Sequence, residues 1–137
     1  MCIRDSKCKE VALNQIGQSS DVVFAVAGGC GLGAITAAKD AKGWGIGVDS
    51  DQSFLGTYVL TSAVKKVDAG VTQTIKLTQD GKYKGGVDAV FNVKNGGVGY
   101  GKVSTAAPNR TALIAKMNAY AKQLAAGSLK PPRTISG

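Results

Sequence analysis

The sequence predicts an α/β protein built on a parallel sheet. The clearest signal is residues 21–52, where two short apolar runs flank a glycine-rich turn and a helix. Apolar runs of this length, bounded by glycines, are typical of parallel strands that are buried on both faces. A strand, a helix and a second strand form a right-handed unit. Because ligands of open parallel sheets bind beyond the carboxyl ends of the strands, we expect the functional site at that edge.

Periodicity divides the chain into alternating elements. Apolar residues at every third or fourth position predict helices, and short apolar runs or strict alternation predict strands. Turn signals, chiefly glycine pairs and Asn-Gly, separate them. In chain order we expect a helix at 8–18, a strand at 22–27, a helix ending at Gly43, strands at 44–48 and 57–63, a helix at 64–79, a strand at 87–93, an extended segment at 98–103, and a helix opened by Asn109 and closed by Gly127.

The same spacing predicts which side chains face the core. These residues recur along one side of each expected helix. They are Val11, Ala12 and Ile16 in the first helix, Leu32, Ile35 and Ala38 in the second, Val64, Val67, Val71 and Ile75 in the third, and Leu113, Met117, Tyr120 and Leu124 in the last.

Length and composition narrow the function classes. A chain of 137 residues can bury one core and form one domain. Its net charge of +8 comes from scattered lysines, which favours a solvated basic surface over the dense basic patch of a nucleic-acid interface. No apolar run reaches the ~20 residues of a membrane-spanning helix, and residues 1–9 lack the apolar segment of a secretion signal.

The reactive residue types are few. The chain has three cysteines and no histidine, so nucleophilic systems that depend on histidine are excluded. Cys2, Cys8 and Cys30 lack metal-binding spacing, and three cysteines cannot all pair within the chain. Cys30 lies in the glycine turn. We expect it to fill a threonine-sized place there, and a reactive thiol near a helix N-terminus is the alternative.

The glycine turn is the first candidate site. The spacing Gly29-x-Gly31-x-x-Ala34 fits the dinucleotide-binding fingerprint, with a strand before it and a helix after it. Asp49 follows at roughly the ~20 residues expected of a ribose-binding acid. Glycines let backbone amides approach a ligand, and a helix N-terminus favours negative charge. A nicotinamide-binding oxidoreductase domain is therefore one alternative, and a turn that only permits tight packing is another.

Two more polar residues follow strand ends. Asp49 lies at the end of the second strand, where a carboxylate can accept hydrogen bonds from two vicinal hydroxyls of a sugar. Asp51 and Ser53 fit the roles of turn former or helix cap. Lys65 follows the third strand and points to the same crevice, where it can donate to a ligand or pair with Asp49. The alternative for Lys65 is an ordinary surface lysine.

These motifs, in this order, resemble the basic membrane protein family, the substrate-binding lipoproteins of ABC transporters that include purine nucleoside receptors. The resemblance covers the chain from about residue 9 to its end, through segments 21–53, 59–71 and 81–99 and the ending AAGSLKPP. Two positions depart from the family pattern. Cys30 replaces an expected threonine, and Trp44 replaces a smaller aromatic residue.

The resemblance implies a type I periplasmic-binding fold, with two Rossmann-like lobes and a nucleoside-like ligand held between them. It implies that Gly28 and Gly29 lie against the ligand, that Asp49 binds ribose hydroxyls and that Lys65 completes the polar wall. It implies binding without catalysis or cofactor, with ABC permease subunits as partners and no nucleic acid. The resemblance also implies a location at the cell surface or in the periplasm, where a lipid anchor attaches the protein to the membrane.

The resemblance also predicts how the chain is organised. Residues 1–7 resemble a translated sequencing adapter, and we expect them to be extraneous. Residues 8–137 are expected to be the C-terminal part of a substrate-binding protein, comprising the second lobe and a hinge crossing near residues 61–66. A transcription regulator of the same fold, with a DNA-binding helix pair ahead of it, is a further class that this segment leaves open.

Overall fold

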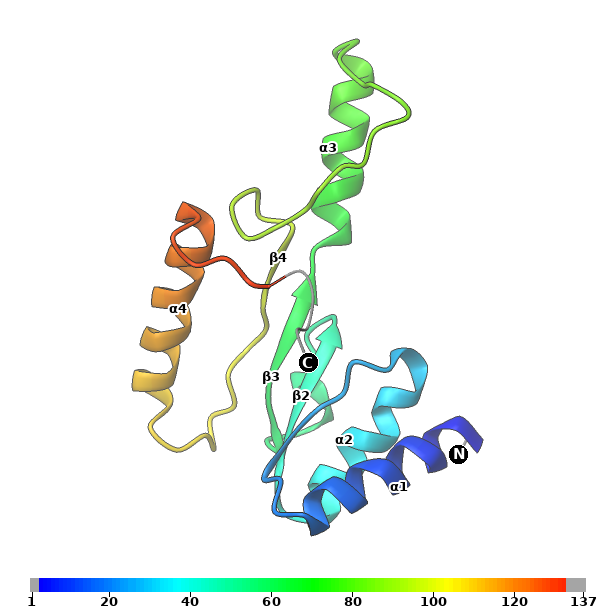
Figure 1. Ribbon diagram of the computed structural model, residues 1–137, viewed down its shortest axis with the longest axis vertical. Helices are drawn as coiled ribbons and strands as arrows, with labels where there is room; N and C mark the ends of the chain where they lie inside the picture. The colour runs from blue at the N-terminus through cyan, green and yellow to red at the C-terminus, as the bar shows by residue number, and fades with distance from the viewer. Residues whose placement is uncertain (1–2, 133–137) are drawn as a thin grey trace. The chain divides into compact units, whose positions relative to one another are not determined.

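A computed structural model describes residues 3–132 (Figure 1). The chain forms two compact units. Unit 1 comprises the chain up to Lys65 and the segment Tyr100–Arg110, and unit 2 comprises Lys66–Gly99 and the chain from Thr111 onward. None of the helices within residues 3–132 has both the length and the apolar content that crossing a membrane requires.

Unit 1 is the α/β unit that the sequence predicts. Its helices and strands, in chain order, are α1 (Ile3–Gly17), β1 (Val22–Phe24), α2 (Gly31–Asp40), β2 (Trp44–Asp49) and β3 (Val59–Lys65), with short 3-10 turns η1 (Gly28–Cys30) and η2 (Ser53–Leu55). The sheet order is β1-β2-β3-β4, and β1, β2 and β3 pair in parallel. The parallel α/β prediction is confirmed, although α1 begins five residues before the predicted helix.

The core of unit 1 lies between α2 and the sheet. Ile35 and Ala38, predicted to face the core, are fully buried. Helix and sheet approach closely because β2 has glycine beneath the helix: a Cβ on Gly45 would lie 2.8 Å from Cδ1 of Ile35. The buried cluster also includes Ala12, Val23, Ala25, Ala34, Ala37 and Val59. A core made largely of alanine and valine allows α1 and α2 to pack against each other at short range.

The prediction that β1 is buried on both faces is wrong. Val23 and Ala25 are buried, whereas Phe24 and Val26 are exposed, Val26 to 72%. Successive side chains of a strand point to opposite faces, and in the described part of the chain only one face of β1 is covered. Val11 and Leu32, expected on the buried sides of α1 and α2, are also exposed.

Unit 2 contains α3 (Val67–Gln79) and nearly all of α4 (Arg110–Ala126). The short strand β4 (Val98–Tyr100) lies where the chain returns to unit 1. Helix α3 begins three residues later than predicted, because Val64 extends β3 through its pairing with Asp49. Gly127 follows α4 with a φ of 74°, as expected of a residue that ends a helix.

The predicted strand at 87–93 is absent. Most of this segment has no regular structure and leads into a turn at residues 93–96. Within it, Asn95 Oδ1 accepts a hydrogen bond from the Asn92 amide (2.7 Å), and Asn95 Nδ2 donates to the Val90 carbonyl (2.8 Å). Alternation of apolar residues favours a strand only when a partner strand is available. In residues 3–132 no strand pairs with this segment, and local side-chain hydrogen bonds set its path instead.

Candidate ligand-binding site at the carboxyl edge of the sheet

Asp49 and Lys65 meet at the carboxyl edge of the sheet. Asp49 ends β2 and Lys65 ends β3, and the parallel register sets Asp49 opposite Val64. Lys65 Nζ therefore lies 2.6 Å from Asp49 Oδ1. The side chains are 56% and 68% exposed, respectively, so both charges face solvent. The structure joins these two predicted site residues as an ion pair.

Asp49 occupies a strained turn. Its φ is 69°, and the Ser50 amide donates to the Val48 carbonyl at 2.8 Å. A central residue with a positive φ, together with a hydrogen bond between residues i and i+2, is characteristic of the rare and strained form of the γ-turn. Aspartate tolerates this region better than most residues, but the conformation still costs free energy. The turn directs the chain out of the sheet immediately at the candidate ligand residue.

Asp51 contributes to the folding of the turn, as its predicted role as a turn former requires. Its Oδ1 accepts a hydrogen bond from the Ser53 amide (3.1 Å), and its Oδ2 accepts one from the Lys102 amide (3.3 Å). Burial raises the pKa of the Asp51 carboxyl, but the hydrogen bonds from Ser53 and Lys102 and the positive charge of Lys102 outweigh it, so the net pKa is lowered. The second contact joins residues far apart in sequence, and sequence reasoning missed it.

A buried serine fixes the chain that follows. Ser62 is fully buried in β3, and its Oγ accepts the Gln52 amide at 3.0 Å. The Gln52 side chain donates in turn to the Val48 carbonyl at 3.3 Å. There is no room for a larger residue here: a Cβ on Gly47 would lie 2.7 Å from both Gln52 Oε1 and Ser62 Oγ. Hydrogen bonds with β3 and within the turn thus fix the position of the turn that carries Asp49.

The four glycines of the first turn divide into two pairs. Gly31 and Gly33 serve packing, because a Cβ on Gly31 would lie 3.1 Å from the Ala25 carbonyl oxygen, and one on Gly33 would collide with the Asp5 carbonyl. Gly28 and Gly29 are exposed, and a Cβ on either would meet no atom within 4 Å. Gly28 also has a φ of 55°. Tight packing thus explains the second pair, and the first pair is open to a ligand.

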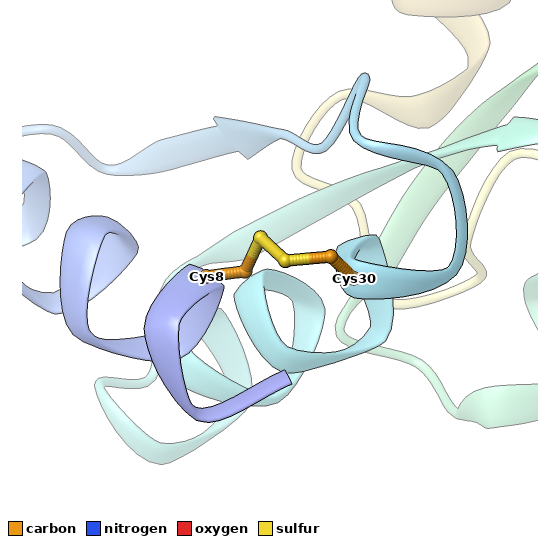
Figure 2. The surroundings of a disulfide bond; sticks show 2 residues. All are labelled: Cys8 and Cys30. Atoms are coloured by element: carbon orange, nitrogen blue, oxygen red, sulfur yellow. A yellow bond between two sulfur atoms is a disulfide. The ribbon is translucent and has the colours of Figure 1, made fainter. Parts of the chain in front are cut away.

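Cys30 is bonded to Cys8, contrary to the expectation of an unpaired residue. Figure 2 shows the disulfide between α1 and the end of the glycine turn, with the Cα atoms 5.9 Å apart. The bond encloses β1 within a loop of sequence separation 22. Three cysteines without a characteristic spacing carry no signal for which two will pair, so only the approach of α1 to η1 identifies the pair.

A groove elsewhere in unit 1 does not coincide with this edge. It has a volume of about 280 Å³ and runs between α1 and β1, where its lining includes Val11, Phe24 and Val26. Its lining does not include Asp49 or Lys65. Among the residues that the structure describes, no group of three or more acidic, cysteine or histidine side chains could hold a metal ion. The carboxyl edge itself presents the carboxylate of Asp49 and the ammonium group of Lys65.

The fold is that of solute-binding proteins of ABC transporters. An ABC transporter solute-binding protein from Aeropyrum pernix matches with a TM-score of 0.70 and 20% identity, over 95% of this chain and 45% of its own. A transcriptional activator of the comK gene from Bacillus halodurans matches with a TM-score of 0.83 and 24% identity, over 93% of this chain and 44% of its own. At these identities the likeness concerns the fold alone.

The chain belongs to the Bmp family, the PnrA-like ABC transporter substrate-binding proteins, whose family model matches residues 4–129. The nucleoside-binding protein BmpA of Lactococcus lactis is 39% identical over an alignment of 114 residues that covers 70% of this chain and 32% of that protein. Basic membrane protein D of Borreliella burgdorferi is 39% identical over 95 residues, 66% of this chain and 28% of its own. An uncharacterized lipoprotein of Pyrococcus abyssi is 32% identical over 96 residues, 65% of this chain and 24% of its own.

These matches confirm the family resemblance seen in the sequence. The chain spans about a third of the length of the curated relatives it matches. It carries a substrate-binding fold of an ABC transporter family, and that family includes lipoproteins.

Proposed function

We propose that this chain binds a nucleoside, or a similar small molecule containing ribose, as part of the substrate-binding component of an ABC importer. The observation that carries the proposal is the strained turn that presents Asp49 beside Lys65. The family match and the nucleoside-binding relative support the same ligand class. In this proposal the ligand is bound and released unchanged, without a cofactor.

The Asp49–Lys65 pair has the features of a binding site rather than of a structural contact. An ion pair whose two side chains are mostly exposed contributes little to stability. Strained backbone, by contrast, is concentrated at functional sites, where the surrounding structure compensates for it. The Asp49 carboxylate keeps one oxygen outside the 2.6 Å contact, and a carboxylate has lone pairs for two hydroxyls. Lys65 can then donate to an acceptor on the same ligand.

Gly28 and Gly29 supply the second part of the proposed site. They follow β1 at the same carboxyl edge of the sheet, because β1 and β2 are parallel neighbours. Their exposed backbone offers amide groups without side chains that would keep a ligand at a distance. A ribose held by Asp49 and Lys65 would extend toward these glycines.

The wider organisation follows from the same proposal. Residues 8–137 would form the C-terminal part of a longer substrate-binding protein, with the second lobe and a hinge crossing near residues 61–66, and residues 1–7 would be extraneous. The whole protein would be lipid-anchored at the cell surface or in the periplasm and would deliver its ligand to permease subunits. The family match and the lipoprotein relative support this placement.

The test is calorimetric titration of the full-length protein that contains this segment. The ligands are a ribonucleoside, its 2′-deoxy analogue, the free base and a nicotinamide dinucleotide. We expect binding of the ribonucleoside, weaker binding of the other nucleoside and of the base, and no turnover. Binding of the dinucleotide in preference to the ribonucleoside would overturn the proposal and support the oxidoreductase alternative.

A further inference from the structure

The short turn at residues 49–52 contacts the two points of unit 1 at which the chain leaves for unit 2 and returns from it. The chain leaves unit 1 after Lys65 and returns to it at Tyr100. Asp49 pairs with Lys65 at the point of departure. Asp51 accepts a hydrogen bond from the Lys102 amide at the point of return. Only Ser50 separates the two acidic residues in the sequence, so both belong to the same short turn.

The return segment, residues 100–104, approaches the turn closely. A Cβ on Gly101 would lie 2.8 Å from Asp51 Oδ1 and 3.0 Å from its Cγ, so only glycine fits without a shift. The Gly101 amide donates to the Ser62 carbonyl (2.8 Å), and Thr61 Oγ1 donates to the Gly101 carbonyl (3.2 Å). Ser62 also holds Gln52 through its hydroxyl. Strand β3 therefore supports the return segment and the acidic turn together.

We propose that Asp51 is a positioning residue of the ligand site, whose carboxylate fixes the return segment to the turn and thereby sets the direction of the Asp49 carboxylate. This inference rests on the proposed function of Asp49. Both Asp51 carboxylate oxygens already accept hydrogen bonds from backbone amides, one from Ser53 and one from Lys102. Asp51 thus acts on the ligand through Asp49.

A positioning role has a consequence that a purely structural role lacks. Recognition of two vicinal hydroxyls needs a carboxylate directed at both. A turned Asp49 loses one of the two hydrogen bonds, so the preference for a ribonucleoside over its 2′-deoxy analogue should fall by about tenfold. Mere destabilisation lowers the fraction of folded protein and leaves the preference of the folded fraction unchanged.

The first experiment measures the contact itself in the 137-residue chain without ligand. Asp51→Asn preserves size but cannot accept both amides as a carboxylate does, and Asp21→Asn, at the amino end of β1, is the matched control. Amide hydrogen exchange should rise at Lys102 and Ser53 in Asp51→Asn and not in Asp21→Asn. The Ala25 amide, bonded to the Ile46 carbonyl, reports global opening and should stay unchanged. Unchanged exchange at Lys102 would overturn the proposal.

A second variant approaches the contact from its other side. Gly101→Ala retains Asp51 but places a methyl group against its carboxylate, so it should reproduce the exchange pattern of Asp51→Asn. If Asp51→Asn does not fold, Gly101→Ala decides the outcome. Wild-type exchange at Lys102 and Ser53 in Gly101→Ala would count against the contact.

The second experiment titrates the full-length protein and the same variants with a ribonucleoside and its 2′-deoxy analogue. The proposal expects the preference between them to fall in Asp51→Asn and Gly101→Ala and to persist in Asp21→Asn. Faster exchange at Lys102 with an unchanged preference would reduce Asp51 to a structural residue and overturn its positioning role. If the wild-type protein binds no ribonucleoside, the proposed function is overturned, and the role of Asp51 in ligand binding is overturned too. The titration of the wild-type protein by itself distinguishes this outcome from the failure of the positioning role.

Discussion

Asp49 and Lys65 end neighbouring parallel strands, and their side chains form an ion pair with 2.6 Å between Oδ1 and Nζ. Because both side chains are largely exposed, a ligand can replace each partner's contact with little loss of folding stability. The ion pair holds the lysine ammonium beside the carboxylate. Its replacement by a ligand is the basis of the first prediction.

Asp49→Ala in the full-length protein should abolish detectable ribonucleoside binding, and Asp51→Ala should lose much less. A hydrogen bond to a charged acceptor is worth roughly 1.5–3 kcal/mol, or about a tenfold or larger loss of affinity for each of two bonds. Asp51 makes neither bond directly. Calorimetric titration with a ribonucleoside and its free base compares the two variants, and equal losses would reject the assignment of Asp49.

Two glycine variants should separate packing from ligand binding. Gly33→Ala should destabilise unit 1 by about 1–3 kcal/mol or more, because its Cβ collides with the Asp5 carbonyl and overpacking strains both helices. Gly29→Ala meets open space and should leave the free energy of unfolding nearly unchanged, yet weaken ligand binding in the full-length protein. Urea unfolding and calorimetric titration measure the two effects. A destabilised Gly29→Ala with full affinity would contradict this division.

Reduction of the Cys8–Cys30 disulfide should destabilise the chain. Closing a loop of sequence separation 22 limits the unfolded ensemble and is worth about 3 kcal/mol, which corresponds to a fall in melting temperature of roughly 10 °C or more for a chain of this size. Thermal melting with and without reductant measures the shift. The double variant Cys8→Ala/Cys30→Thr should melt like the reduced protein and show no further response to reductant. Thiol labelling that does not increase on reduction would show the bond to be absent.

Acid should remove a stabilising contribution from Asp51. Its pKa in the folded protein lies below the ordinary value of 3.8, so the unfolded chain binds this proton more readily. The contribution is complete above 3.8 and is lost as the pH falls through the folded pKa. Urea unfolding from about pH 6 to about pH 2 should show the stability difference between wild type and Asp51→Asn shrinking below this value. An Asp51 carboxyl that titrates above 3.8 by NMR would contradict this prediction.

The 137-residue chain alone should associate and bind apolar dyes. Helix α3 presents Val67, Val71 and Ile75 at 67%, 53% and 52% exposure, and the structure shows no cover for this stripe within the described residues. Each such side chain is worth about 1.5–3 kcal/mol when fully buried, so exposed stripes promote association. Size-exclusion chromatography with dye binding tests this. A monomer that binds no dye and melts sharply at high temperature would show the stripe to be covered, and ligand binding by this chain alone should be weak or absent.

The sequence predicted the parts of the fold that local patterns determine. Two apolar runs around a glycine turn defined the strand–helix–strand unit, and the parallel rule then placed Asp49 and Lys65 at one edge. The exact end of β3 escaped prediction because Val64 also fits the helical spacing of Val67, Val71 and Ile75. Its β-branched side chain and its pairing with Asp49 place it in the strand. The prediction of a strand at 87–93 was wrong because a strand also requires a partner strand, and the periodicity of a segment does not reveal whether a partner is present.

The parts that escaped prediction depend on contacts between distant residues. Nothing in the spacing of the cysteines links Cys8 to Cys30, and nothing in the GVDSDQ motif links Asp51 to Lys102. The exposure of Phe24 could not be predicted either, because the sequence of an apolar strand does not indicate whether another layer covers its second face. The position of Asp49 and Lys65 at one sheet edge followed from local patterns, whereas the contacts that support the turn are tertiary.

The contact between Gly33 and Asp5 constrains the path of the backbone and leaves the choice of side chain open. The atom that fills the space over Gly33 is a carbonyl oxygen, which every amino acid possesses. This contact therefore depends on the helix continuing through residue 5 and not on which side chain stands there. A foreign helical leader can make the same backbone contact with Gly33, so this contact by itself carries no information about the ancestry of the leader.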